Sequence, residues 1–284
     1  MSGITSKLKF VPSMITCTSA FCGTMATIFA LDGEQSLVYA SYFILLASLC
    51  DFSDGFAARL LHAQSELGKQ LDSLADAISF GIAPTAIMYA LLRQAMHLRG
   101  ALISFDGVQI AVLACSAIII ICSILRLAKF NIDPEQSYGF KGLATPANAL
   151  LIASIPLIQA MELEDFWLYN VLKDCISSAV DTKLMLGLIG LQVFVLDRVA
   201  YLLPLCIIFA LLMITNLPMF SLKMKSYKYK NNKLVYNFLI VSALLLIVLQ
   251  WVAVPIIFIM YVIVSFVRWL VNRKKTATVE TVEH

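Results

Sequence analysis

Charged residues are scarce in this chain. Of its 284 residues only 14% are Asp, Glu, Lys or Arg, whereas 60% are hydrophobic, and the mean hydropathy is +0.86. Soluble domains carry charge on about a quarter of their residues. The composition therefore excludes an ordinary water-soluble domain and is typical of an integral membrane protein.

Histidine and paired cysteine are also lacking. The three histidines are His62, His97 and His284, which argues against a histidine metal centre. The seven cysteines include no C-x-x-C pair and lie mostly inside apolar segments, so we interpret them as buried small residues rather than as disulfide partners or zinc ligands.

The first apolar segment follows two lysines and has no small-residue cleavage site ahead of a polar domain. A removed signal peptide is therefore not expected.

Long apolar runs are what the sequence has instead. A helix needs about 20 apolar residues to cross about 30 Å of hydrocarbon. We therefore predict an all-α integral membrane protein, in which a bundle of six spans is followed by two C-terminal spans. The eight predicted transmembrane helices are 14–31, 38–61, 70–92, 108–129, 143–161, 199–220, 234–250 and 253–271.

Basic residues near the span ends predict the orientation, because Lys and Arg mark the cytoplasmic side. Lys7 and Lys9 precede the first span, and the run KMKSYKYKNNK at 223–233 holds five lysines. We interpret this run as a topogenic loop, with contact to anionic headgroups as the alternative. An apolar segment at 183–196 is too short to span comfortably, so we expect an interfacial, re-entrant or bent segment within 162–198.

Four carboxylates stand at the ends of two apolar stretches, in DFSDGFAARLLHAQSELGKQLDSLAD at 51–76. Asp51 and Asp54 are three residues apart and Asp72 and Asp76 are four apart, so each pair shares one face of a helix. The polar turn between the pairs predicts an antiparallel hairpin. All four carboxylates are then expected to converge near the cytoplasmic surface.

Four like charges in a partly dehydrated site repel one another and require a cation. Oxygen ligands alone favour hard divalent ions, Mg²⁺ or Mn²⁺, and a pair of such ions clamps a phosphoryl group. Gly55 and Ala58 leave room beside the helix, and Arg59 offers a planar donor for a phosphate. In the alternative interpretation the small residues serve helix packing and the aspartates pair with arginine, but one arginine cannot balance four aspartates.

The stretch fits the pattern D-x2-D-G-x2-A-R-x8-G-x3-D-x3-D, which resembles the CDP-alcohol phosphotransferase family. Members are integral membrane enzymes that displace CMP from a CDP-linked lipid by an alcohol. The runs LDSLADAISFGIAP, LRLAKFN, FKGLATPANA and LMITNLPMFSLK resemble its phosphatidylserine synthase branch. The pattern is filled by Asp51, Asp54, Gly55, Ala58, Arg59, Gly68, Asp72 and Asp76.

The resemblance implies a role for each aspartate. Asp51, Asp54 and Asp72 would bind one of two divalent metal ions, Mg²⁺ or Mn²⁺, and Asp72 and Asp76 would help to hold the other. Asp76 is also the expected general base toward the attacking hydroxyl. The residues expected to contact the CDP-lipid are Thr16, Gly55, Ala58, Arg59 and Ser65, whereas Ser19 stands where asparagine is common in the family.

An acceptor such as serine is a zwitterion, so its pocket needs a cation for the carboxylate. Basic and amide residues gather at the end of the fourth span and in the loop that follows: Arg126, Lys129, Asn131 and Lys141. Arg126 is the first choice for the carboxylate and Lys141 the second. The alternative interpretation of each is a topogenic or snorkelling residue.

The resemblance extends over about residues 10–224. It implies a catalytic membrane core at 1–224, a basic cytoplasmic loop at 225–233, a C-terminal pair of helices at 234–272 and a cytoplasmic tail at 273–284. Because the C-terminal pair falls outside the resemblance, truncation after about Lys225 is expected to leave the activity largely intact.

The implied activity is transfer of the phosphatidyl group from CDP-diacylglycerol to L-serine, which gives phosphatidylserine and CMP by direct displacement. Phosphatidylglycerophosphate synthesis is the alternative within the family. A divalent-cation transporter is the alternative outside it, although the acidic residues concentrate at one depth of one hairpin. We expect membrane lipid and a second copy of the chain as partners, no nucleic acid, and a site facing the cytoplasm of a bacterial inner membrane.

Overall fold

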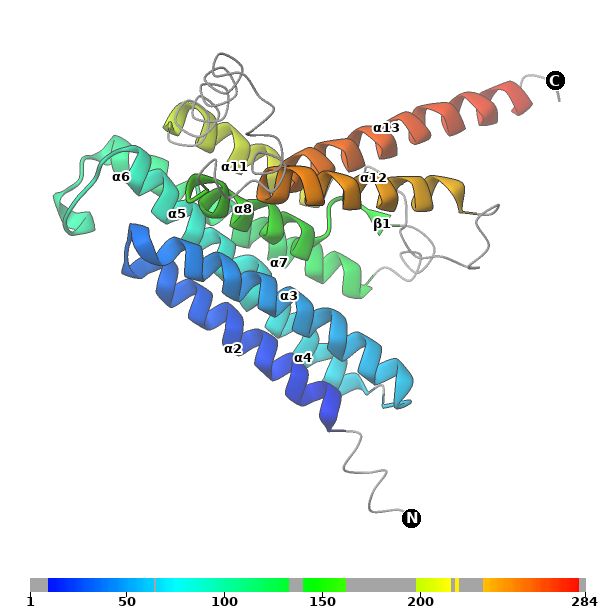
Figure 1. Ribbon diagram of the computed structural model, residues 1–284, viewed down its shortest axis with the longest axis horizontal. Coiled ribbons are helices and arrows are strands. Elements are labelled where there is room, and N and C mark those ends of the chain that lie inside the picture. The colour runs from blue at the N-terminus through cyan, green and yellow to red at the C-terminus, as the bar shows by residue number, and fades with distance from the viewer. Residues whose placement is uncertain are drawn as a thin grey trace, which may run out of the picture.

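The protein is a bundle of helices (Figure 1). The computed structural model describes residues 10–63, 65–132, 140–161, 198–215, 218–219 and 232–280. Its α-helices are α2 (Val11–Asp32), α3 (Leu37–Leu60), α4 (Glu66–Ala77), α5 (Ala83–Ala95), α6 (Gly107–Ala114), α7 (Ala117–Ile132), α8 (Thr145–Gln159), α11 (Val199–Ile214), α12 (Lys233–Leu249) and α13 (Ala253–Glu280). Shorter elements are the 3-10 turns η1 (Glu34–Ser36), η3 (Leu102–Ser104) and η8 (Gln250–Val252), the π-helix η2 (Ile78–Ile82), and the paired strands β1 (Phe140–Lys141) and β2 (Pro218–Met219).

Five of the described segments are long and apolar enough to cross a membrane: Val11–Asp32, Glu34–Leu60, Glu66–Ala95, Gly107–Ile132 and Lys233–Leu270. The last of these contains both α12 and α13, and α8 and α11 are shorter apolar helices. The predicted all-α membrane fold is therefore confirmed, and a helix lies at each of the eight predicted positions. The segment predicted to be interfacial lies, apart from its last residue, outside the described residues.

One predicted boundary was wrong. The helix predicted at 199–220 ends at Ile214, because Thr215 has an extended ψ of 146° and the chain then pairs β2 with β1. Proline lacks a backbone N–H and disfavours helical backbone before it, so Pro218 is consistent with this early end. The end of the last predicted span, residue 271, agrees with the apolar segment that ends at Leu270, and helix α13 continues beyond this segment to Glu280.

Proline and serine set several helix starts. Pro12, Pro84 and Pro146 lie in the first turns of α2, α5 and α8, where a missing N–H costs no helical hydrogen bond. Ser65 caps α4, since its Oγ accepts a hydrogen bond from the backbone N–H of Gly68 at 3.0 Å. Pro12 and the Ser65 cap thus mark where α2 and α4 begin, at the end of the bundle that carries the aspartates.

Helix α2 packs very closely against the π-helix η2. A Cβ added to Gly23 would lie 2.5 Å from Ser79 Cα, so only glycine fits there. Ser79 Oγ also donates a hydrogen bond to the carbonyl of Ser19 at 2.9 Å. Because η2 begins two residues after Asp76, this contact fixes the helix segment that presents Asp76.

The C-terminal helices belong to the same core as the rest of the bundle. Helices α12 and α13 turn back on each other at η8, and the far end of α13 extends beyond the bundle (Figure 1). Val252 and Phe258 are buried in one cluster with Ile44 and Ile152, and Phe258 makes an edge contact with Phe209 at 5.3 Å between ring centroids. Helices α12 and α13 therefore contribute buried side chains to the core of the bundle.

Candidate active site

The aspartate-bearing ends of α3 and α4 both lie against α2, near the lower end of the bundle in Figure 1. The predicted hairpin has α3 running to Leu60 and α4 starting at Glu66. However, each of the two helices packs on α2 far more extensively than on the other. The candidate active site is the space that this packing leaves between α3 and α4.

Three of the carboxylates converge. Ligand oxygens of Asp51, Asp72 and Asp76 all lie within 4.8 Å of one another. Asp54 is close enough to interact electrostatically with each of them. Three oxygen donors at this separation, without nitrogen or sulfur, fit a hard divalent cation such as Mg²⁺ or Mn²⁺.

Asp54 is held by a threonine from the neighbouring helix. Thr16 Oγ1 on α2 lies 2.6 Å from Asp54 Oδ2 and 3.0 Å from the carbonyl of Pro12, and its single hydroxyl hydrogen serves one acceptor at a time. The shorter distance is typical of a hydrogen bond to a carboxylate. Asp54 is only 6% exposed. Thr16, which the sequence predicts as a CDP-lipid contact, therefore also orients an aspartate.

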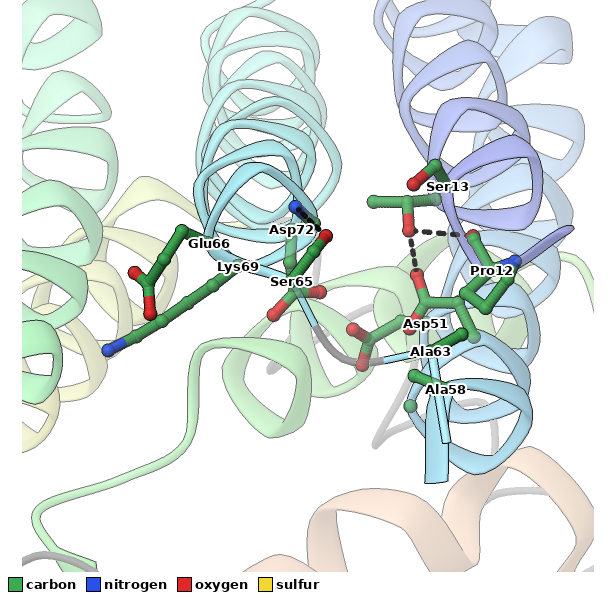
Figure 2. A pocket seen from close by; sticks show the side chains of 13 residues that line it. Pro12, Ser13, Asp51, Ala58, Ala63, Ser65, Glu66, Lys69 and Asp72 are labelled. Carbon is green, nitrogen blue, oxygen red and sulfur yellow. Dashed lines mark hydrogen bonds between the residues drawn. The ribbon is translucent and has the colours of Figure 1, made fainter. Parts of the chain in front are cut away.

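A cavity of about 620 Å³ opens between α2, α3 and α4 (Figure 2). Four of the five residues predicted to contact the CDP-lipid line it, and so do three of the aspartates. Its lining residues are Pro12, Ser13, Thr16, Asp51, Asp54, Gly55, Ala58, Ala63, Ser65, Glu66, Gly68, Lys69 and Asp72. The cavity thus places small residues and hydroxyl groups directly beside the carboxylates.

Arg59 is the predicted lipid contact that does not line this cavity. It is exposed, and its Nε donates a hydrogen bond to the carbonyl of Gly55 at 2.9 Å, one turn earlier on α3. Lys69, to which the sequence assigned no role in the site, also lines the cavity. Figure 2 shows the side chains of Lys69 and Glu66 directed away from Asp51. The helical spacing of Ser65, Lys69 and Asp72 could have placed Lys69 there.

Gly55 leaves space for something other than a neighbouring helix. A Cβ added to Gly55 would meet no atom of the described residues within 4 Å, whereas one added to Gly23 would clash. Close helix packing therefore does not explain Gly55. The free space next to it belongs to the cavity.

Arg126 lies deep in the bundle at the other side of the carboxylates. It is 9% exposed, and its nearest Nη lies 3.4 Å from Thr145 Oγ1 on α8. Its Nε has no hydrogen-bond partner among the described residues. Arg126 also interacts electrostatically with Asp76, the predicted base.

The other predicted acceptor residues lie elsewhere. Lys129 is exposed on α7. Asn131 is also exposed, and its Nδ2 donates a hydrogen bond to Ser73 Oγ at 2.9 Å, which ties α7 to α4. Lys141 belongs to β1, where its backbone pairs with Pro218. Arg126 is therefore the predicted acceptor residue for which the described residues give an electrostatic interaction with an aspartate of the site.

Sequence reasoning missed Asn148. This residue is 0% exposed, and neither its amide oxygen nor its amide nitrogen has a partner among the described residues. It follows Thr145 by one turn and shares its face of α8. A lone amide in the apolar run ATPANALL was the signal. Buried amides are normally hydrogen-bonded, so this one is conspicuous.

Comparison with known proteins identifies the family. Residues 9–174, more than half of the chain, match the model of the CDP-alcohol phosphatidyltransferase family. The chain is 34% identical over 144 residues to the CDP-diacylglycerol–serine O-phosphatidyltransferase of Bacillus subtilis, which covers 49% of this chain and 71% of that protein.

Other relatives align over a similar segment. The enzyme of the same name from Helicobacter pylori is 33% identical over 153 residues, with 53% of this chain and 59% of that protein covered. The archaetidylserine synthase of Methanothermobacter thermautotrophicus is 34% identical over 152 residues, with coverages of 52% and 58%. The chain thus spans less than two thirds of these two relatives. The match to the family model, which includes all four aspartates, shows that the chain belongs to the CDP-alcohol phosphatidyltransferase family.

Proposed function

We propose that this protein transfers the phosphatidyl group of CDP-diacylglycerol to L-serine. The observation that carries the proposal is the convergence of Asp51, Asp72 and Asp76 beside a cavity that Gly55 keeps open. The names of the Bacillus and Helicobacter relatives support serine as the acceptor. The products are phosphatidylserine and CMP.

The chemistry is a single displacement at phosphorus. Serine Oγ attacks the β-phosphorus of CDP-diacylglycerol and forms the new P–O bond, while the P–O bond to CMP breaks and CMP leaves with the electron pair. Asp76 accepts the hydroxyl proton, as a general base within the carboxylate cluster. No cysteine or histidine is among the described residues that line the cavity, which supports direct displacement without a covalent intermediate.

The four aspartates would hold two divalent ions, Mg²⁺ or Mn²⁺, with Asp51, Asp54 and Asp72 around one and Asp72 and Asp76 around the other. When bound, such ions neutralise the pyrophosphate and improve CMP as a leaving group. Thr16 keeps Asp54 in place through its hydroxyl group. Gly55 and Ala58 give the CDP-lipid room beside α3, and Ser65 and Arg59 supply polar contacts at the rim.

Arg126, which interacts electrostatically with Asp76, binds the acceptor. Its guanidinium group offers a fork of donors to the carboxylate of serine, with Lys141 as a second cation. Basic residues at the same span ends support a site facing the cytoplasm, and the family resemblance supports a homodimer.

The test is CMP release by the purified full-length protein in mixed micelles with CDP-diacylglycerol and Mg²⁺ or Mn²⁺. Serine, glycerol 3-phosphate, inositol phosphate and no acceptor are compared. We expect rapid CMP release with serine only. Release with glycerol 3-phosphate only would overturn the serine assignment and favour phosphatidylglycerophosphate synthesis. No release with any acceptor would overturn the enzymatic function.

A further inference from the structure

Three residues on α3, α7 and α8 have buried side-chain atoms without a hydrogen-bond partner among the described residues. These atoms are Ser48 Oγ, Arg126 Nε and both polar atoms of the Asn148 amide. Ser48 precedes Asp51 by one turn of α3, and α3 packs on α8, the helix that carries Asn148. Buried polar groups are normally hydrogen-bonded. The unpartnered atoms therefore indicate a polar ligand that would bind between these helices.

Two hydrogen bonds place Arg126 opposite Asp76. Asn131 Nδ2 on α7 donates a hydrogen bond to Ser73 Oγ on α4 at 2.9 Å, and Ser123 Oγ donates one to a backbone carbonyl of η2 at 3.4 Å. Helix α7 therefore runs antiparallel to the segment formed by α4 and η2. Arg126 follows Ser123 by three residues and Asp76 follows Ser73 by three, so each shares the face of its hydrogen-bonded neighbour. The guanidinium group and the predicted base thus lie between the two bonds, on facing sides of the two segments.

Thr145 connects Arg126 with Asn148. Arg126 Nη1 donates a long hydrogen bond to Thr145 Oγ1 at 3.4 Å, and both residues are buried. Asn148 lies three residues after Thr145 on α8, and side chains at this spacing are neighbours on one face of a helix, with about 5–6 Å between their Cβ atoms. The Asn148 amide, which is 0% exposed, is therefore the next polar group beyond Thr145 on the face that contacts Arg126.

An amide in this position suits the ammonium group of an amino acid. Such an acceptor brings one carboxylate and one ammonium group, and Arg126 offers donors only, which match the carboxylate. The aspartates of the cluster are assigned to the metal ions. Asn148 Oδ1 can accept a hydrogen bond from the ammonium group without adding a further negative charge beside the four aspartates.

We propose that Asn148 binds the ammonium group of the acceptor while Arg126 binds its carboxylate, so that Asn148 selects an amino acid over an acceptor without an amino group. The proposal rests on the proposed function of the site. The selectivity arises because a buried amide that is built to pair with an ammonium group stays unpaired when the acceptor lacks that group.

The test is Asn148→Leu in the full-length protein, which removes both polar atoms and keeps the branched shape of the side chain. Because the amide has no partner in the described part of the chain, folding loses no hydrogen bond and Tm should not fall. We expect KM for serine to rise about 10–100-fold, as for the loss of a hydrogen bond to a charged group. KM for CDP-diacylglycerol should change less than about twofold by comparison.

Asn148→Ala is the second variant, in case leucine is too large for the site. Ser154→Ala is the matched control, because Ser154 is buried on the same helix but its Oγ donates a hydrogen bond to the carbonyl of Leu151 at 2.6 Å. This control should leave KM for serine unchanged.

Two analogues of serine separate the ends of the acceptor. 3-Hydroxypropionate keeps the carboxylate and lacks the amino group, whereas ethanolamine keeps the amino group and lacks the carboxylate. In Asn148→Leu, the inhibition constant against labelled serine should rise for ethanolamine and stay within about twofold for 3-hydroxypropionate. Arg126→Lys should show the reverse. An unchanged KM for serine, or equal losses of affinity for the two analogues in Asn148→Leu, would overturn the proposal.

Thermal stability keeps this proposal apart from the proposed function. Serine that binds the folded protein raises its Tm, whether or not serine reacts. If the wild-type protein releases no CMP with serine, the proposed function fails. A rise in Tm with serine in the wild-type protein, and none in Asn148→Leu, would then still support Asn148 as the ammonium partner. If serine gives neither CMP release nor a rise in Tm, both proposals fall.

Discussion

Gly55 and Asp76 illustrate two ways in which single residues define the site. Gly55 stands in the interior of α3, where glycine is less favourable than alanine by about 0.5–1 kcal/mol. No neighbouring protein atom requires it. A residue that costs helix stability and contacts nothing is explained by a ligand that occupies the space beside it.

Replacing Gly55 by alanine should therefore affect stability and lipid binding in opposite directions. We expect Gly55→Ala to raise Tm in detergent, because the helix gains about 0.5–1 kcal/mol. KM for CDP-diacylglycerol should rise, because the new methyl group enters the cavity. Ser53→Ala on the same helix is the control, since Ser53 lies outside the cavity lining. A lower Tm, or an unchanged KM for the lipid, would count against a ligand role for Gly55.

Asp76 is the residue that the mechanism needs most. General bases contribute about 10²–10⁴-fold to rates, so Asp76→Asn should reduce phosphatidylserine formation by about 100-fold or more. Its helix segment is fixed by the contact between Gly23 and Ser79, so the substitution is expected to leave Tm within a few degrees. Substantial phosphatidylserine formation by this variant, measured as labelled lipid, would refute the base assignment.

At the scale of elements, the connection at residues 140–144 links the acceptor residues to α11. Gly142 has a φ of +74°, and an added Cβ would lie 2.7 Å from the carbonyl oxygens of Met213 and Thr215. The backbone N–H of Leu143 donates a hydrogen bond to the carbonyl of Leu212 at 3.1 Å. Any side chain at position 142 would therefore meet both a strained left-handed backbone and a steric clash with α11.

Gly142→Ala should destabilise the protein by about 2 kcal/mol or more, because alanine pays for the left-handed backbone and must also displace two carbonyl groups. We expect a lower Tm and a higher KM for the acceptor. Gly33→Ala is the matched control, since Gly33 also has a positive φ but an added Cβ there meets no atom within 4 Å. Equal losses in the two variants would mean that the contact with α11 has no role.

The sequence was sufficient to predict most elements, because long apolar runs specify helices and the spacing of four aspartates specifies two helix faces. It could not predict that α3 and α4 would pack on α2 more than on each other. It also missed the strand pairing of Lys141 with Pro218, since two-residue strands leave no periodic pattern. Long-range partners such as Thr16 with Asp54 depend on packing that spacing alone does not contain.

At the scale of the whole molecule, the carboxylate cluster lies inside the family-matched region, and we propose that it binds divalent ions. Three converging oxygen ligands without an opposing metal leave like charges unbalanced. Removal of divalent ions with EDTA should abolish CMP release, and Mg²⁺ or Mn²⁺ should restore it. Because an ion that binds only the folded state raises its stability, the ions should also raise Tm.

Asp72→Asn provides the control for this prediction, since Asp72 belongs to the cluster and to the cavity lining. The variant should show a much smaller rise in Tm with Mn²⁺ than the wild-type protein. Full activity after chelation, or an equal rise in Tm in the variant, would contradict a metal role for the cluster.

The central claim is that one phosphatidyl group passes directly to serine for each CMP released. The most direct measurement follows radiolabelled serine into the lipid phase while CMP is quantified in the same reaction. We predict equal amounts of labelled phosphatidylserine and CMP, and no exchange of labelled CMP into CDP-diacylglycerol when serine is absent. CMP release without label in the lipid, or exchange without serine, would contradict the account.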